Sequence, residues 1–238
     1  MSPLKILDTE IDAITLKEVV ALFDNALCSK IPQLFLATVN PEILLHAHRH
    51  RPYREVLQRF SLRLADGVGV KLIVAMRGKK MERLTGRRLL QTLLQLADQK
   101  KIKVFIALNR SGLTDAAAAE LCLKTKYPGA EISVKAIVRS EDLSETVAAE
   151  IVVAGLGAPW QEEWLERHRA KFSRARVLLG VGGAVDVLCG RLPAPPNIIA
   201  AIGLEWLWRL MIQPKRLPRI LRAVVVFPLT VLFHRWLH

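Results

Sequence analysis

The chain of 238 residues is 51% hydrophobic and 24% charged, a composition that excludes a disordered protein and allows a substantial core. Its 35 Lys and Arg against 22 Asp and Glu give a formal charge of +13, which favours polyanionic partners such as nucleic acid, acidic lipid or phosphate-bearing substrates. Cys28, Cys122 and Cys189 are too few and too far apart for a disulfide framework or a zinc cluster and indicate a reducing cytosol.

Short apolar runs alternate with helical patterns along most of the chain. Five runs that are apolar on both faces predict strands of a parallel sheet, at 33–38, 103–108, 131–138, 150–155 and 176–182. Capping signals and apolar periodicity predict helices at 16–28, from Pro41 onward, and at 68–77, 86–99, 113–125, 141–149 and 160–171. This alternation predicts a Rossmann-like, doubly wound α/β fold with a mostly parallel sheet over residues 1–195.

The composition changes after residue 195, and residues 196–238 are predicted to form a basic helical appendage. Pro214, Pro218 and Pro228 are expected to break it into short helices. The longest uncharged apolar run, 223–233, has 11 residues, whereas a helix that spans a membrane needs about 20. We therefore expect the appendage to lie on a membrane surface without crossing it.

The stretch LADGVGV at residues 64–70 has two interpretations. Asp-Gly between apolar residues is a strong hairpin signal. The residues that follow, GVKLIVAMRG, fit a helix better than a second strand, which predicts a strand-to-helix turn with Asp66 at the carboxyl end of a strand. Ligands of open α/β sheets bind at that edge.

Three further segments are predicted to end at the same edge: ATVN at 37–40, AGLG at 154–157 and GVGG at 180–183. Each is suited either to cradle a phosphate on backbone N–H groups or simply to pack tightly. Asn40 has in addition the local signature of a helix N-cap. None of the segments matches G-x-G-x-x-G or a Walker loop, which disfavours NAD and P-loop chemistry.

Six ordered motifs, ATVNPEIL, LADGVGV, RLTG, GLGAPWQE, GVGGAVDVLCG and GLEWLWRL..QPKR, resemble the WecG/TagA/CpsF glycosyltransferases, glycosyltransferase family 26. The resemblance covers about residues 33–222. It implies transfer of a sugar, typically N-acetylmannosamine, from a UDP donor to an undecaprenyl-diphosphate-linked sugar for bacterial cell-surface polysaccharide synthesis. The chain is shorter than the family around 136–142 and lacks its aromatic segment there, so transfer of glucose or another hexose to the same kind of acceptor is an alternative.

The resemblance also implies roles for individual residues. Asp66 corresponds to a general base, and Arg83 and Gln161 correspond to further catalytic residues. Thr38 and Asn40 correspond to the family's active-site Thr and Asn, which we expect to bind substrate. Beside them we expect the further substrate-binding residues Gly67, Gly157, Glu162, Gly182, Gly183 and Asp186. The implied ligands of the acceptor diphosphate are Arg209, Arg216 and Arg219. No cofactor and no metal ion are expected, because the chain has no D-x-D motif and Arg83 with the glycine-rich N–H groups would take the metal's place.

The expected partners are therefore a UDP-sugar donor, a polyprenyl-diphosphate-linked acceptor and an anionic membrane surface. The expected location is the cytoplasmic face of the bacterial inner membrane, with the protein bound peripherally. A non-catalytic nucleic-acid-binding protein is the alternative from another class. The chain has no helix-turn-helix, RNP or zinc-finger signature to support it. Homo-oligomerisation is left open.

Overall fold

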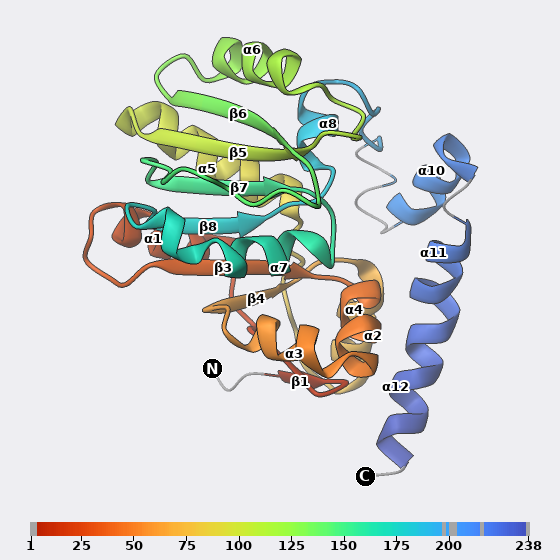
Figure 1. Ribbon diagram of the computed structural model, residues 1–238. Coiled ribbons are helices and arrows are strands. Elements are labelled where there is room, and N and C mark those ends of the chain that lie inside the picture. The colour runs from red at the N-terminus through yellow and green to blue at the C-terminus, as the bar shows by residue number, and fades with distance from the viewer. Residues whose placement is uncertain (1–3, 197–198, 200–203, 215–216, 237–238) are drawn as a thin grey trace.

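The computed structural model describes residues 4–196, 199, 204–214 and 217–236 (Figure 1). A six-stranded parallel sheet in the order β4-β3-β8-β7-β5-β6 forms its centre, and β1 and β2 form a separate antiparallel pair. The strands are β1 (Leu4–Ile6), β2 (Thr9–Ile11), β3 (Leu34–Val39), β4 (Leu62–Ala65), β5 (Lys103–Asn109), β6 (Glu131–Ile137), β7 (Ile151–Gly155) and β8 (Val177–Gly180). The predicted α/β class is confirmed.

Helices follow most strands. They are α1 (Leu16–Leu27), α2 (Pro41–Arg49), α3 (Arg51–Gln58), α4 (Val68–Met76), α5 (Gly86–Lys100), α6 (Ala116–Lys126), α7 (Trp160–Arg167), the 3-10 helix η1 (Arg169–Phe172) and α8 (Ala184–Leu188). The C-terminal helices are α10 (Glu205–Ile212), α11 (Leu217–Leu221), the π-helical segment η3 (Arg222–Val226) and α12 (Phe227–Trp236). Side chains cap several N-termini as the sequence predicts; Thr15 and Glu18 form a capping box at α1.

The sheet separates two hydrophobic cores because alternate residues of a strand point to opposite faces. Phe35, Ala37 and Val39 of β3 belong to one core, with α2, α3, α4 and α7, and Leu34 and Leu36 belong to the other, with α1, α5, α6 and α8. Both faces of the central strands are therefore covered. This explains why β3, β7 and β8 read as continuous apolar runs in the sequence.

The predicted helix at 141–149 does not form. Between β6 and β7 the chain is extended: the Leu143 N–H group donates to Nε2 of His168 (3.2 Å), and the Val147 N–H group donates to the carbonyl of Lys171 (2.9 Å). Leu143 and Ala149 are buried against the sheet in this extended form. Tertiary contacts with α7 and η1 thus override the local helical pattern.

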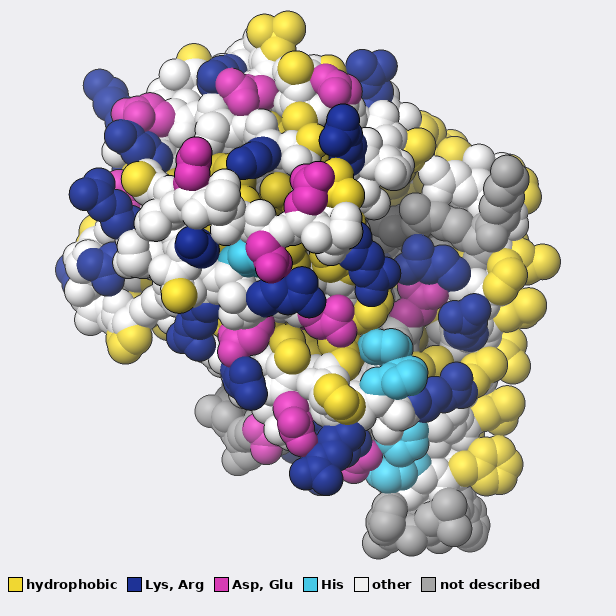
Figure 2. All heavy atoms as spheres, in the orientation of Figure 1, with side chains coloured by type: hydrophobic (Ala, Val, Ile, Leu, Met, Phe, Trp, Pro, Cys, Tyr) yellow, Lys and Arg dark blue, Asp and Glu magenta, His cyan; other side chains and the backbone are white. Residues whose placement is uncertain are grey.

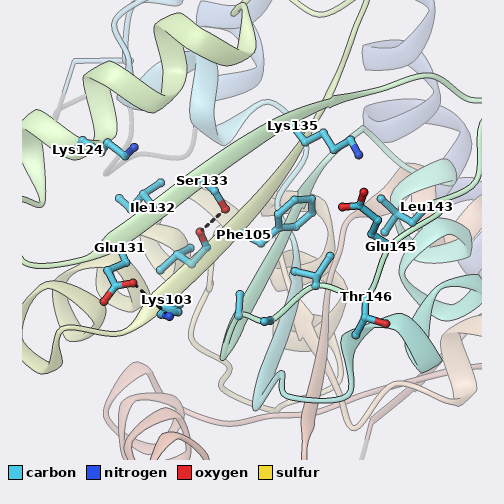
Figure 3. Close-up of a pocket in the computed structure, with 14 residues that line it drawn as sticks. Lys103, Phe105, Lys124, Glu131, Ile132, Ser133, Lys135, Leu143, Glu145 and Thr146 are labelled. Carbon is cyan, nitrogen blue, oxygen red and sulfur yellow. Dashed lines mark hydrogen bonds and ion pairs between the residues drawn. The ribbon is translucent and has the colours of Figure 1, made fainter.

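A cavity of about 550 Å³ lies between this extended segment and strands β5 and β6 (Figure 3). Lys103, Glu131 and Ser133 line one side and Glu145 and Thr146 the other. Lys103 and Glu131 are the first residues of β5 and β6, so the cavity lies away from the carboxyl ends of the strands.

The C-terminal helices form a column on the side toward which the strands point (Figure 1). The prediction that Pro218 and Pro228 break this segment is wrong, because α11, η3 and α12 follow one another without interruption from 217 to 236. Pro218 lies in the first turn of α11, where no N–H group is needed. Before Pro228 the helix widens, and the Phe227 N–H group donates to the carbonyl of Arg222, five residues back. The π segment thus accommodates a residue that has no N–H group of its own.

One face of this column packs on the α/β core. Phe227 and Val231 are buried in the same cluster as β3, and Phe227 lies against Gly69 of α4. The opposite face carries a row of exposed hydrophobic side chains, seen along the edge of the molecule in Figure 2: Leu217, Leu221, Val224, Val225, Leu229, Leu232 and Phe233. The stretch Leu217–His234 is, by length and composition, apolar enough to cross a membrane, although only 11% of it is buried in the protein. This stretch of 18 residues is longer than the 11-residue uncharged run seen in the sequence, because the helix continues without interruption on the N-terminal side of that run.

Candidate functional site

Asn40 and Asp66 follow two neighbouring strands at the same level. The last residues of β3 and β4, Val39 and Ala65, are partners in the parallel ladder. Asp66 continues this pairing, since its N–H group donates to the carbonyl of Val39 (2.8 Å). The sheet register therefore brings the half-buried Asp66 beside the start of α2. The hairpin interpretation of LADGVGV is wrong, and the strand-to-helix turn is confirmed.

Gly67 makes this close approach possible. Its φ angle is +98°, which L side chains rarely adopt, and a Cβ atom there would lie 3.2 Å from Cδ of Pro41. Asn40 caps α2 by accepting a hydrogen bond from the N–H group of Ile43 (3.0 Å) at its Oδ1. The predicted capping role of Asn40 is confirmed, and its side chain is fixed beside the Asp66–Gly67 turn.

Thr38 connects this pair of strands to the next one. It is 5% exposed, and its hydroxyl donates to the carbonyl of Gly180 at the end of β8 (3.2 Å). The N-terminus of α5 meets the same point, because a Cβ atom on Gly86 would lie 3.2 Å from Val181 and 3.4 Å from Oγ1 of Thr38. The RLTG and GVGG motifs, far apart in the sequence, are therefore neighbours of Thr38.

Gln161 lies in the first turn of α7 and reaches across the end of β8. Its Oε1 accepts from the N–H group of Gly182 (2.8 Å), and its Nε2 donates to Oε1 of Glu162 (2.7 Å). The other oxygen of Glu162 accepts from the hydroxyl of Tyr53 on α3 (3.0 Å). Glu162 is 0% exposed and bonded to protein groups on both oxygens, and its predicted contact with substrate stays a prediction.

Burial changes the acid-base behaviour of this pair. Desolvation raises the pKa of Glu162 from 4.5 to about 7, against the opposing effect of the hydrogen bonds from Gln161 and Tyr53. Burial, together with the negative charge of Glu162, raises the pKa of the Tyr53 hydroxyl well above 10. Tyr53 therefore stays a hydrogen-bond donor at neutral pH, whereas Glu162 is close to the midpoint of its titration.

The remaining predicted residues of the nucleotide side lie around α8 and α7. Gly183 is exposed directly before α8, and Asp186 accepts a hydrogen bond from the buried hydroxyl of Thr114 (2.6 Å). Asp186 thus holds the loop before α6 against α8. Gly157, with φ +84°, precedes α7, and its carbonyl accepts from the N–H group of Gln161 (3.0 Å).

The comparison with known proteins decides the family. Residues 4–238, nearly the whole chain, match the glycosyl transferase WecG/TagA/CpsF family. The chain belongs to this family.

Two similar WecG/TagA/CpsF relatives come from Staphylococcus aureus, and both carry the name N-acetylglucosaminyldiphosphoundecaprenol N-acetyl-beta-D-mannosaminyltransferase. The protein of strain MRSA252 is 33% identical over 205 residues, which cover 82% of this chain and 78% of the relative. The protein of strain NCTC 8325 / PS 47 is 32% identical over 203 residues with the same coverage. The resemblance drawn from the motifs is confirmed.

The structure describes the side chains of two of the four arginines that the WecG/TagA/CpsF resemblance assigns to the substrates, Arg83 and Arg219. Arg83 lies in the loop whose next residue, Leu84, donates its N–H group to the carbonyl of Ala65 (2.9 Å), so this loop passes the end of β4. Arg219 forms a bidentate ion pair with Glu42 of α2, with Nη2 and Oε2 2.7 Å apart. Arg216 and the side chain of Arg209 lie outside the described residues.

Sequence reasoning missed Tyr53 altogether, because an aromatic residue in an amphipathic helix reads as core. No local signal points to it, because its partner Glu162 is 109 residues away in the sequence. Among the residues that the structure describes, no group of three or more His, Cys, Asp or Glu side chains is placed to hold a metal ion.

Proposed function

We propose that the protein is an inverting glycosyltransferase that moves N-acetylmannosamine from UDP to an undecaprenyl-diphosphate-linked N-acetylglucosamine. The observation that supports this best is the convergence of Asp66, Asn40 and Thr38 at the carboxyl edge of the sheet, in a chain of the WecG/TagA/CpsF family. The names of the relatives support the sugar and the acceptor.

Asp66 would act as the general base. Its carboxylate takes the proton of the acceptor hydroxyl while that oxygen attacks the anomeric carbon of the donor. The bond from the anomeric carbon to the UDP oxygen breaks, and its electron pair leaves with the β-phosphate. A single in-line displacement of this kind inverts the anomeric centre. A positioned base contributes about 10²- to 10⁴-fold to the rate.

The departing diphosphate needs positive charge or N–H donors in the same place. We propose that Arg83 and the backbone N–H group of Gly183 supply them, without a metal ion, since the N–H group of Gly182 already donates to Gln161. The N-terminus of α5 lies beside Thr38 and favours negative charge there.

The acceptor is a membrane lipid, so the protein must work at a membrane surface. The exposed hydrophobic row of α11, η3 and α12 would enter the interface, and Arg219 on the same column would approach the acceptor diphosphate. We therefore propose peripheral binding to the cytoplasmic face of the bacterial membrane.

The test is a screen of UDP-sugars with a short-chain lipid-diphosphate acceptor, for wild type and Asp66→Asn. We expect transfer from UDP-N-acetylmannosamine and a loss of at least about 10²-fold in kcat for Asp66→Asn with UDP binding retained. Asp24→Asn, which changes a surface carboxylate on α1, is the matched control and should keep wild-type turnover. Preferred transfer from UDP-glucose would select the alternative donor, and near-normal turnover of Asp66→Asn would contradict the role of the base.

A further inference from the structure

A fully buried carboxyl group lies one residue from Gln161. Glu162 is 0% exposed, and each of its oxygens accepts one hydrogen bond, from Tyr53 (3.0 Å) and from Gln161 (2.7 Å). The fold takes this acid out of water at a cost, because desolvation disfavours its charged form. An apolar side chain would fill the same space without that cost. The choice of an acid therefore needs a reason other than packing.

The geometry of the neighbouring amide supplies the reason. Gln161 is 2% exposed, with its nitrogen on Glu162 and its oxygen on the N–H group of Gly182. These two partners fix which end of the amide faces which way. Gly180 leaves the space for it, since a Cβ atom there would lie 2.9 Å from Nε2 of Gln161. The amide is thus held at both ends across the carboxyl end of β8.

The hydrogen bond to Gly182 acts on the backbone of the candidate site. Gly182 has a φ angle of +54° and begins the turn from β8 into α8. Two residues earlier, at the end of β8, the carbonyl of Gly180 accepts a hydrogen bond from the hydroxyl of Thr38. The orientation of the Gln161 amide therefore affects the position of the Gly182 backbone relative to Thr38.

We propose that Glu162 and Tyr53 are positioning residues that hold Gln161 in place. Through this amide they fix the turn at Gly182, and thereby the position of the next N–H group, that of Gly183, which is proposed to face the donor diphosphate. The inference rests on the proposed function only in its claim about turnover; the claim about the turn stands on the contacts alone.

Substitutions at Glu162 separate hydrogen bonding from charge. Glu162→Gln keeps an oxygen for Gln161 and gives Tyr53 an N–H group to accept, so the chain of contacts is preserved without charge. Glu162→Met has a similar shape but leaves the buried donors of Gln161 and Tyr53 without an acceptor. Glu163→Gln removes a charge from the next position of α7 and is the matched control.

Tyr53→Phe removes one hydroxyl and leaves the ring in place. The chain contains one other tyrosine, Tyr127, which is half-buried at the end of α6. Tyr127→Phe is therefore the matched control for Tyr53→Phe. Thermal unfolding of each variant, recorded first, sets a temperature at which all of them are folded.

The first readout does not depend on activity. In protein labelled at its glycines, the amide signal of Gly182 should shift and lose protection from solvent exchange in Glu162→Met, and to a smaller extent in Tyr53→Phe. It should stay unchanged in Tyr127→Phe and Glu163→Gln. An unchanged Gly182 signal in Glu162→Met would overturn the proposal, whether or not the protein transfers sugars.

The second readout is a double-mutant cycle on turnover. We expect Glu162→Met to lower kcat/KM at least about 10-fold and Glu162→Gln to stay within about threefold of wild type. If Glu162 acts through the amide, Glu162→Met should cost little more in a Gln161→Ala background. Full additivity of the two substitutions would overturn the proposal. A wild type that transfers no sugar, with the Gly182 shifts as expected, would refute the proposed function and the turnover claim while the positioning of the turn stands.

Discussion

Replacing Glu162 by Gln should make the protein more stable at pH 8 than wild type. Because burial raises the pKa of Glu162 from 4.5 to about 7, the folded protein binds a proton between these values that the unfolded chain has released. The contribution of Glu162 to the free energy of unfolding is therefore most favourable below pH 4.5, and it falls as the pH rises from 4.5 to about 7. The shift corresponds to about 3 kcal/mol of unfolding free energy, taken as an upper limit. Gln does not ionise and avoids this loss.

The measurement is urea unfolding of both proteins from pH 5 to 8.5, with the difference between them plotted against pH. The polar groups that face this site, namely Glu163 on α7, Tyr53 on α3 and His46 on α2, are present in both chains, so only changes in their coupling to position 162 enter the difference. We expect the difference to grow with pH up to about 7 in favour of Gln and then to level off. Glu163→Gln serves as the control. A difference that is constant with pH would refute the burial argument.

Three further outcomes are expected. Transferase activity should persist in EDTA, because Arg83 and backbone N–H groups are proposed to stabilise the departing diphosphate; loss of activity that Mg²⁺ or Mn²⁺ restores would contradict this. A chain that ends at residue 197 should no longer sediment with anionic vesicles and should have little transferase activity, and equal sedimentation with normal turnover would argue against a role for the C-terminal column. Phe227→Ala should lower the free energy of unfolding by about 3 to 5 kcal/mol because Phe227 is fully buried, whereas Phe233→Ala, at a position 66% exposed, should have little effect; equal urea midpoints would show that α12 is not docked.

The sheet could be predicted because its central strands are buried on both faces. The prediction that the strand at 131–138 is also covered on both faces is wrong, because β6 lies at the edge of the sheet and alternates between buried and exposed residues. The runs at β3, β5, β7 and β8 are apolar without alternation, a pattern that a parallel sheet between two helical layers requires. The turn at Asp66 could be predicted because a helix pattern follows it. Neither inference needs information from distant parts of the chain.

The predictions that failed concern segments whose structure depends on contacts with residues distant in the sequence or on a local change of helix type. The segment 141–149 is extended because it bonds to His168 and Lys171, and the C-terminal helix passes Pro228 because a π segment precedes it. The hairpin of β1 and β2 is too short to give a pattern.

The candidate site divides in the same way. Asp66 and Asn40 could be placed at the sheet edge from the sequence, because each follows a strand signal. The burial of Glu162 could not be foreseen, since its partner Tyr53 comes from a helix that is 109 residues away in the sequence. A buried acid and a solvent-facing acid in the first turn of a helix look alike in the sequence; only the packing of α3 against α7 separates them.

The position of β8 has a consequence for how the protein is made. This strand is the last of the sheet in the chain, yet it lies between β3 and β7, and its contact with Thr38 joins residues 142 positions apart. Until β8 has been synthesised and inserted, β4-β3 and β7-β5-β6 remain two separate halves without a shared core. Such non-local pairing is slow to form and leaves apolar strand edges open to aggregation in the meantime. Because Thr38 comes from one half and Gln161 follows the other, a nascent chain that stops before β8 would hold the parts of the site without assembling them.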